Sequence, residues 1–296
     1  MQSDTPLTAA PSPDSADTRQ VRYWNSPATA PWVTWQERLD EMFAPLTNAA
    51  MDLAKPAPGE QVLDVGCGCG ATVLELARRV GIAGRVRGID ISAPMLARAE
   101  NRVTAAEITG VTLTLADAAT YAFEPASLDL VFSRVGVMFF GDPIGAFGNL
   151  RRALKPSGRM VFLCCRSAAE NRYITTAVQA AQPLLPPGAT PIPGPEEPGM
   201  FSLADPARVR RILGAAGFRD VDLQPLDQRM RLAGPGGAAD GAAFSLQFGP
   251  LTRVLGEAGP ALQQSILDAV TETYRRLEQP EGIMLDGAFW IVTAHP

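Results

Sequence analysis

A strand-like segment that runs directly into three alternating glycines constrains the fold of this chain more than any other feature. The segment is Val62-Leu63-Asp64-Val65-Gly66-Cys67-Gly68-Cys69-Gly70, and a helical pattern follows it over Ala71–Val80. Glycines at such a turn let the backbone approach a ligand closely and place amide N–H groups at a helix N-terminus. A tight turn without a ligand is the structural alternative, and Gly66-x-Gly68-x-x-Ala71 also satisfies the permissive dinucleotide-binding pattern.

Short β-branched or apolar runs alternate with helical patterns over Gln61–Cys165, which predicts βαβ units on a parallel sheet. The expected strands are Gln61–Val65, Val86–Ile91, Val111–Leu115, Leu128–Ser133 and Arg159–Cys165. The expected helices are Ala71–Val80, Pro94–Val103 and Ile144–Leu154, the last ended by Lys155-Pro156-Ser157-Gly158. The predicted fold is α/β, with a doubly wound, mostly parallel sheet and helices on both faces.

The regions outside this alternation have patterns of their own. Residues 1–20 are predicted to be a disordered tail, and residues 21–56 a helical region in which Pro45 should kink or split a helix over Trp32–Lys55. The core takes residues 57–181, and a Pro-rich connection without regular structure follows over 182–200. Residues 201–296 are expected to hold a helix from Asp205-Pro206 to Gly217, strands at Val221–Leu226 and Phe289–Ala294, and a helical insertion over about 232–286.

Composition excludes several classes of function. Lys and Arg number 26 against 31 Asp and Glu, a net charge of −5, so the chain lacks the positive field that favours nucleic acid. No apolar run approaches the roughly 18 residues of a membrane helix. Four cysteines, at Cys67-x-Cys69 and Cys164-Cys165, fit neither a disulfide framework nor a zinc site and favour a reducing cytoplasm. Because the only histidine is His295, imidazole-dependent chemistry is not expected.

Three carboxylates fall at consecutive ends of the expected strands. Asp64 lies in the first strand, Asp90 in the second and Asp117 just after the third. The carboxyl ends of parallel strands line the ligand crevice of an open sheet, so these side chains would face one elongated ligand. Asp90 suits a ribose diol, Asp117 an exocyclic amine, and Asp64 a cationic group. Capping of the next helix by Asp90, and a plain turn at Asp117, are the competing interpretations.

Four motifs in order resemble those of class I S-adenosylmethionine (SAM)-dependent methyltransferases. They are Val62–Gly70, Gly88-Ile89-Asp90-Ile91-Ser92 with Met95-Leu96, Ala116-Asp117-Ala118, and Asp129-Leu130-Val131-Phe132-Ser133-Arg134. The subgroup that the chain is most similar to is the small-molecule enzymes like the ubiquinone/menaquinone C-methylases. The resemblance implies a Rossmann-like domain that uses SAM, leaves S-adenosylhomocysteine and needs no metal.

The resemblance also implies roles for individual residues. Gly66, Gly68 and Gly70 would pack on the methionine part of SAM, with Asp64 ordering the loop or meeting the amino group. Asp90 would hold the ribose hydroxyls. The remaining implied roles are Ile91 and Met95 over the adenine, Asp117 and Ala118 at its edge, Ser133 and Arg134 beside the methyl group, Gly136–Phe140 (with Phe139 and Phe140) as an acceptor wall, and Tyr23, Trp24, Trp32 and Trp35 as lid candidates.

Structural roles compete with several of these assignments. Arg134 could pair with a core carboxylate, Met138–Phe140 could belong to the core, and the N-terminal aromatic residues could serve packing alone. The adjacent thiols of Cys164 and Cys165 point to opposite faces of a strand and are expected to be inert.

The predicted function is methyl transfer from SAM to a small organic acceptor by in-line displacement. The absence of an internal histidine favours acceptors that are already nucleophilic, although a carboxylate or Tyr23 could serve as a base. An NAD(P)-dependent oxidoreductase is one alternative, but none of the four tyrosines is followed four positions later by lysine. A SAM-binding module without catalysis is the other. The pattern leaves the catalytic residues, the methylated atom and the oligomeric state open.

Overall fold

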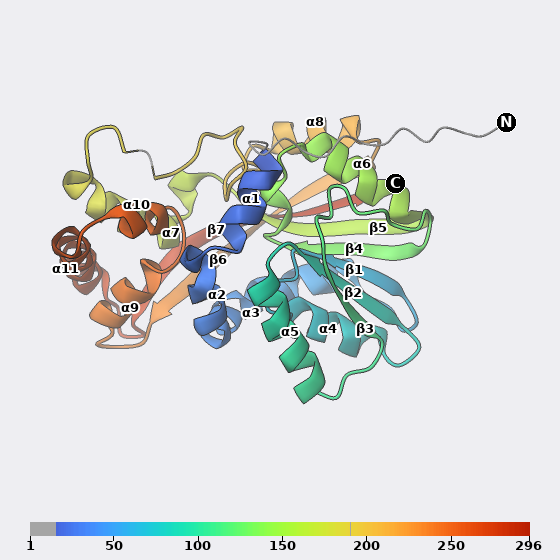
Figure 1. The fold of residues 1–296 in the computed structure, drawn as a ribbon, viewed down its shortest axis with the longest axis horizontal. Coiled ribbons are helices and arrows are strands. Elements are labelled where there is room, and N and C mark those ends of the chain that lie inside the picture. The colour runs from blue at the N-terminus through green and yellow to red at the C-terminus, as the bar shows by residue number, and fades with distance from the viewer. Residues whose placement is uncertain (1–15, 190) are drawn as a thin grey trace.

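The computed structural model describes residues 16–189 and 191–296 (Figure 1). Its centre is a seven-stranded sheet in the order β3-β2-β1-β4-β5-β7-β6. The strands are β1 (Gln61–Val65), β2 (Arg85–Asp90), β3 (Val111–Leu115), β4 (Leu128–Arg134), β5 (Leu154–Cys165), β6 (Arg219–Ala233) and β7 (Ile283–His295). Strands β1 to β5 are parallel, and β7 runs antiparallel to both β5 and β6. The predicted α/β architecture with a mostly parallel sheet is confirmed.

Helices cover both faces of this sheet. Figure 1 shows α3, α4 and α5 on one side of the strands and α6 and α8 on the other. Helices α9 to α11 lie at the far end of the long β6–β7 pair. The helices are α1 (Ala16–Trp24), α2 (Ala30–Thr34), α3 (Gln36–Ala54), α4 (Ala71–Val80), α5 (Ala93–Ala105), α6 (Pro143–Ala153), α7 (Arg172–Ala181), α8 (Pro206–Ala215), α9 (Ala238–Ser245), α10 (Leu251–Glu257) and α11 (Pro260–Leu277).

The central strands form because their residues suit burial on both faces. Leu63 of β1 and Leu130, Val131 and Phe132 of β4 are completely buried, as expected for parallel strands covered by helices on each side. Strand order reverses between β1 and β4, which are neighbours although β2 and β3 intervene in sequence. Open α/β sheets bind ligands at the carboxyl ends of the strands beside such a switch point. The glycine-rich segment lies at this point.

Two expectations about the N-terminal region are wrong. Of the tail expected over 1–20, residues 1–15 lie outside the described residues, but residues 16–20 belong to α1. Pro45 neither splits nor ends its helix, because α3 is continuous over Gln36–Ala54 and the break falls at Trp35. Pro45 is exposed, so the carbonyl that loses its N–H partner lies on the solvent side of the helix.

The C-terminal part also differs from expectation in its strand lengths. Strand β6 has 15 residues and β7 has 13, whereas the sequence pattern predicted only Val221–Leu226 and Phe289–Ala294. The ends of the insertion expected over 232–286 are therefore strand, and its helices occupy only Ala238–Leu277. Strand β5 likewise begins at Leu154, before the Lys155–Gly158 turn that was expected to precede it, with an irregular register against β4.

Among the described residues, none of the helices combines the length and the apolar character needed to cross a membrane.

Candidate active site

The three carboxylates lie where the strand pattern places them. Asp64 is the penultimate residue of β1, Asp90 the last residue of β2, and Asp117 follows β3 by two residues. Because β1, β2 and β3 are parallel neighbours, all three groups lie at the same edge of the sheet. We call this region, with the loop Gly66–Gly70, the glycine-loop edge.

The loop itself requires glycine for two separate reasons. Gly66, Gly68 and Gly70 all have positive φ, at 68°, 52° and 83°, a conformation that other residues rarely adopt. The loop also packs closely on the segment after β4, since a Cβ added to Gly66 would lie 2.8 Å from Cα of Gly136. The sulfur of Met95 is the nearest group to a Cβ built on Gly68, at 3.8 Å. Positive φ thus favours glycine at all three positions, and close packing also excludes a side chain at Gly66.

Asp64 is a completely buried carboxyl group with one unsatisfied oxygen. The hydroxyl of Thr72 in α4 donates to Oδ2, whereas Oδ1 has no partner among residues 16–189 and 191–296. Burial raises the pKa of Asp64 to about 7, although the Thr72 hydroxyl and the guanidinium of Arg134 act in the opposite direction. A buried acceptor without a donor is costly, so a cationic or donor group placed near Oδ1 would be stabilised.

Asp90 holds the glycine loop and the start of α5 together. Its Oδ2 accepts a hydrogen bond from the Gly68 amide at 2.7 Å, and its Oδ1 accepts from the Ser92 amide at 2.8 Å. Burial nevertheless raises the pKa of Asp90, and these two amides oppose that effect. Each carboxylate oxygen has a second lone pair, so Asp90 can order the loop and still accept from ligand hydroxyls.

Asp117 and Ala118 are fixed by the turn after β3. Oδ1 of Asp117 accepts from the Ala119 amide at 2.8 Å. This contact is the one expected of a plain turn aspartate, the interpretation that competes with a ligand-binding role. Burial raises the pKa of Asp117, and the negative charge of Asp17 in α1 adds to the shift. The Ala118 carbonyl accepts from the Asn149 side chain at 3.0 Å, so a side chain of α6 holds this turn in place.

Ser133 and Arg134 have structural partners at the end of β4. The Ser133 hydroxyl is buried and donates to the Val65 carbonyl at 2.7 Å, which ties β4 to the start of the glycine loop. Arg134 donates to the Thr47 hydroxyl at 3.0 Å and lies 3.9 Å from Asp40. In this structure, Arg134 thus contacts a hydroxyl and a partly buried carboxylate of α3.

The N-terminal segment lies across the glycine-loop edge. Asn25 donates to the Ile91 carbonyl at 2.8 Å and accepts from the Ala93 amide at 3.0 Å. Ser92 does not cap α5 with its side chain, and its hydroxyl donates instead to the Trp24 carbonyl at 2.8 Å. Three hydrogen bonds thus fasten this segment to the turn between β2 and α5.

Aromatic contacts continue this cover. Trp24 packs edge-on against Trp32 and against Phe139, with ring centroids 5.7 and 5.2 Å apart. The Tyr23 ring packs edge-on against Trp24, and its hydroxyl lies 3.4 Å from that of Thr252 near α10. Trp35 instead packs on Phe244 of α9, and Phe140 on Phe147 of α6. Of the aromatic candidates, Tyr23, Trp24, Trp32 and Phe139 therefore form one cluster, which Trp35 joins through Phe244 and Phe248. Phe140 packs toward α6 instead.

Sequence reasoning missed the polar residues that hold this cover in place. Asp40 of α3 accepts from Arg102 of α5 at 2.7 Å, and Arg102 also donates to the carbonyl of Cys69 in the loop at 2.6 Å. Asn25 was missed as well. The contacts from Asn25 to Ile91 and from Arg102 to Asp40 join residues more than 60 positions apart and follow no motif, so only the aromatic pattern nearby marked the region.

The remaining reactive side chains are two buried thiols and one histidine. Burial raises the pKa of the Cys164 thiol well above its usual value, and that of Cys165 to about 12. His295 lies at the end of β7, which runs antiparallel to β5, and so belongs to the sheet edge opposite the glycine loop. In the described ranges 16–189 and 191–296, no cluster of His, Cys, Asp or Glu side chains could hold a metal ion.

Comparisons with known proteins give this geometry a context. Residues 62–158 match the model of a family described as a methyltransferase domain. The chain is 35% identical over 154 residues to the aklanonic acid methyltransferase DauC of Streptomyces sp. (strain C5), covering 51% of this chain and 64% of that protein. It is 39% identical over 125 residues to the nocamycin O-methyltransferase of Saccharothrix syringae, covering 40% and 43%. The alignments thus span less than two thirds of either relative.

The fold has solved counterparts. A phosphoethanolamine N-methyltransferase 2 from Haemonchus contortus, in complex with phosphomonomethylethanolamine and S-adenosylhomocysteine, matches with a TM-score of 0.54 at 18% identity. The match covers 91% of this chain and 57% of that one. At this identity the similarity establishes the Rossmann-like architecture. Together with the family match, it confirms the resemblance that the four sequence motifs indicated.

Proposed function

We propose, on the premise that residues 62–158 form a methyltransferase domain, that this chain transfers a methyl group from SAM to a small organic acceptor. Its named relatives are methyltransferases, and the solved counterpart from Haemonchus contortus is a complex with S-adenosylhomocysteine. The alternative of an NAD(P)-dependent oxidoreductase has no such support among these relatives.

The observation that carries the proposal is the buried carboxyl group of Asp64 at the entrance to the glycine loop. Within the part of the chain that the structure describes, its Oδ1 lacks a hydrogen-bond donor although the residue is completely buried. An ionised Asp64 would repel the pyrophosphate of a dinucleotide but attract an ammonium or sulfonium group. The loop thus fits a nucleoside that carries positive charge better than one that carries phosphates.

The residues present divide the work of binding such a nucleoside. Asp90 would accept from the ribose hydroxyls, and Asp117 from an exocyclic amine of the base, while Met95 packs beneath the loop. Gly66, Gly68 and Gly70 would leave room for the amino-acid end of SAM, with Asp64 near its ammonium group. SAM supplies a methyl group on a sulfonium, a leaving group that needs no protonation.

The chain's contribution to the reaction is then alignment and the exclusion of water. In-line displacement needs the acceptor atom held close to the methyl carbon, and both effects lower the barrier without a proton transfer. The cluster of Tyr23, Trp24, Trp32 and Phe139 would provide a water-poor cover over that point. His295 lies at the opposite sheet edge, so an imidazole base is not part of the proposal.

The acceptor is proposed to be a small organic molecule. The relatives named for aklanonic acid and nocamycin act on compounds of that kind, as their names state. Acceptors that are nucleophilic without strong base catalysis, such as amines, thiols, phenolates or activated carbons, suit a site without histidine.

Mass spectrometry of small molecules released from the denatured protein tests the proposal. SAM or S-adenosylhomocysteine in the extract is the expected result, and a second compound would identify an acceptor candidate. Recovery of a nicotinamide dinucleotide would contradict the proposal. If the protein is empty, calorimetric titration with S-adenosylhomocysteine and NAD⁺ decides between the same two outcomes.

A further inference from the structure

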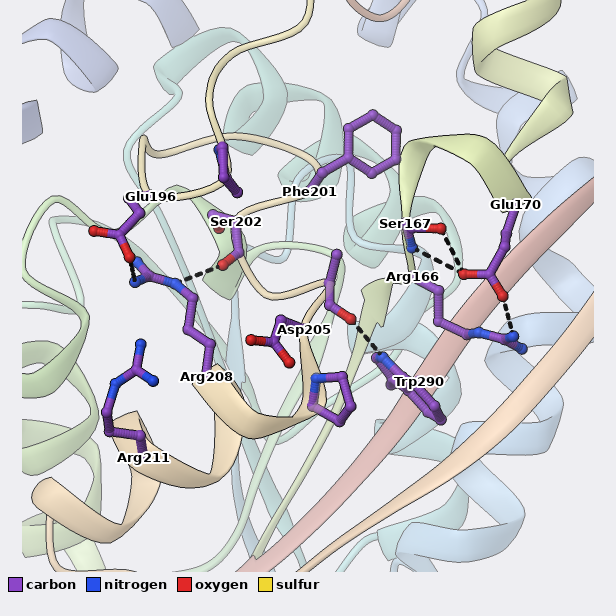
Figure 2. Close-up of a pocket in the computed structure, with 13 residues that line it drawn as sticks. Arg166, Ser167, Glu170, Glu196, Phe201, Ser202, Asp205, Arg208, Arg211 and Trp290 are labelled. Atoms are coloured by element: carbon purple, nitrogen blue, oxygen red, sulfur yellow. Dashed lines mark hydrogen bonds and ion pairs between the residues drawn. The ribbon is translucent and has the colours of Figure 1, made fainter.

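A cavity lies outside the glycine-loop edge. It has a volume of about 490 Å³, within the range of small-molecule sites, and none of the glycine-loop residues lines it. Its walls come from the turn after β5, the Pro-rich connection, the start of α8 and strand β7 (Figure 2). We call it the α8 cavity.

Unused hydrogen-bond donors face this cavity. The guanidinium of Arg211 in α8 makes no hydrogen bond or ion pair within residues 16–189 and 191–296. Arg166 is only 18% exposed, and its Nη1 and Nη2 donate to Asp227 and Glu170, so that only its buried Nε has no partner within the described residues. Arg208, 15% exposed, donates from Nε to the Ser202 carbonyl and has only an exposed carboxylate beyond it. Because guanidinium groups only donate, an anionic ligand could accept from the exposed Arg211 and, after displacing Glu196, from Arg208.

The acidic residues of the cavity are less free than the arginines. Glu170 accepts from both the amide and the hydroxyl of Ser167 and pairs with Arg166, and the Ser167 hydroxyl is the main reason that the pKa of Glu170 is lowered. Asp205 caps α8 by accepting from the Ala207 amide at 2.9 Å. These carboxylates already bond to donors in the walls of the cavity, so they are less available to a ligand than the arginines are.

Glu196 differs from the other two acids. It lies on the Pro-rich connection, is 79% exposed, and meets Arg208 at 3.2 Å. An exposed pair of this kind contributes little stability, and a ligand carboxylate could replace it at small cost. Figure 2 shows Arg208 and Arg211 extending from one side of α8 toward Glu196, which thus marks the position of a ligand anion.

Apolar surface completes the site. Phe201 and Trp290 line the cavity with Pro195 and Pro206. The Trp290 ring is fixed at its edge by the hydrogen bond from Nε1 to the Ala204 carbonyl at 2.9 Å and on one face by the Arg166 guanidinium, 5.0 Å from the ring centroid. A flat aromatic body fits such a wall better than a fully hydrated ion does.

We propose that the α8 cavity binds an aromatic carboxylate, with the carboxylate on Arg208 and Arg211 in place of Glu196 and the ring against Trp290. The site goes beyond the proposed methyl transfer and does not depend on it. It is nevertheless joined to the donor side, since the Ser202 hydroxyl donates to the Met138 carbonyl at 2.6 Å, next to Phe139.

Calorimetric titration of the full chain with 2-naphthoate tests this proposal, with 2-naphthamide as the neutral analogue. We expect 2-naphthoate to bind, and to bind at least about tenfold more tightly than the amide, since one hydrogen-bonded charge contributes about 1.5 kcal/mol or more. Absence of 2-naphthoate binding, or equal binding of the amide, would overturn the proposal. Binding of inorganic phosphate without 2-naphthoate would overturn the aromatic part of it.

Variants with opposite expected signs locate the site. Arg211→Gln and Arg208→Gln should each weaken 2-naphthoate binding about fivefold, whereas Glu196→Gln should strengthen it about twofold by removing the competing carboxylate. Arg210→Gln, on the same helix but outside the cavity, is the matched control and should change nothing. General damage to the fold could not produce an increase with Glu196→Gln, and equal effects of all four substitutions would contradict the assignment.

Saturation with S-adenosylhomocysteine separates the two sites. Binding of 2-naphthoate should persist in its presence, and loss of binding together with insensitivity to the α8 variants would place 2-naphthoate at the glycine-loop edge instead. If S-adenosylhomocysteine itself fails to bind, the proposed function fails while the 2-naphthoate titrations keep their meaning.

Discussion

The glycine-loop edge and the α8 cavity are both charged, but different parts of the chain build them. The first is formed by consecutive strand–loop–helix units between Gln61 and Ala118, and two of its carboxylates, Asp90 and Asp117, accept from backbone amides of the same units. The second brings together Arg166, Glu196, Arg208 and Trp290, which lie on four separate segments. Local geometry therefore fixes the first site, whereas tertiary packing fixes the second.

This difference explains the signs of charge in the two regions. Backbone amides at the loop and at a helix N-terminus are donors, so carboxylates can sit among them without a cation. In the α8 cavity, Arg166 and Arg208 pair with acidic side chains instead. We expect substitutions at the glycine-loop edge to disturb both the loop and its ligand, and those in the α8 cavity to change ligand binding alone.

The largest effect should come from Gly66→Val. The substitution combines a left-handed backbone at a β-branched residue, roughly 1–2 kcal/mol, with a close contact to Gly136 that costs about 1–3 kcal/mol. We expect SAM affinity to fall at least about thirtyfold in calorimetry, because 1.4 kcal/mol is a tenfold change. Gly148→Ala is the control, since a Cβ there meets no atom within 4 Å. Retained affinity in Gly66→Val would mean that loop geometry does not govern the donor site.

A second test concerns Asp90, which links the loop to its expected ligand. Asp90→Ala removes a carboxylate that accepts from Gly68 and Ser92 and, in the proposal, from the ribose. Hydrogen bonds to a charged group contribute about 1.5–3 kcal/mol, so SAM affinity should fall about tenfold or more. Asp90→Asn, which keeps one acceptor oxygen, should lose less. Unchanged affinity in Asp90→Ala would end the ribose assignment.

Asp64 should make SAM binding depend on pH. Its folded-state pKa of about 7 is above the ordinary 3.8, so its contribution to stability is full below about pH 4 and is lost as pH rises to about 7. A cationic ligand needs the ionised form, and affinity should therefore rise about fivefold from pH 6 to pH 8. Asp64→Asn should flatten this profile, and an unchanged slope in that variant would assign the pH dependence to another group.

The smallest effect is expected at the N-terminal cover. Asn25→Ala removes two exposed hydrogen bonds to the β2–α5 turn, at about 0.5 kcal/mol or more each. Release of S-adenosylhomocysteine, followed by stopped-flow tryptophan fluorescence, should become about two- to threefold faster if the segment opens for release. An unaltered rate would show that this segment does not limit exit. Thermal unfolding should shift little, which separates this effect from a loss of fold.

The same contrast separates what the sequence could predict from what it could not. Strands β1 to β3 and helix α4 were predicted to within one residue, and Asp64, Asp90 and Asp117 at their expected strand ends, because these features depend on local periodicity and glycine spacing. The continuity of α3 through Pro45 was missed, since it depends on which face of the helix meets solvent.

Long-range contacts account for the other omissions. The cover by Asn25 and the network of Asp40 with Arg102 join segments more than 60 residues apart, and single polar residues in helices give no signal of such pairing. The length of β6 was underestimated because charged residues alternate along its exposed side beyond Leu226, as in Asp227, Arg229 and Arg231. The α8 cavity had no motif at all, so only coordinates could reveal it.

Calorimetric titration of the full chain with S-adenosylhomocysteine, with NAD⁺ as the comparison ligand, tests the central claim most directly. The claim is that the buried Asp64 and the carboxylates beside the glycine loop select a SAM-type nucleoside over a dinucleotide. We predict one site for S-adenosylhomocysteine that is weakened in Asp90→Ala, and no binding of NAD⁺. Binding of NAD⁺ at this loop, or no binding of S-adenosylhomocysteine by the folded protein, would contradict it.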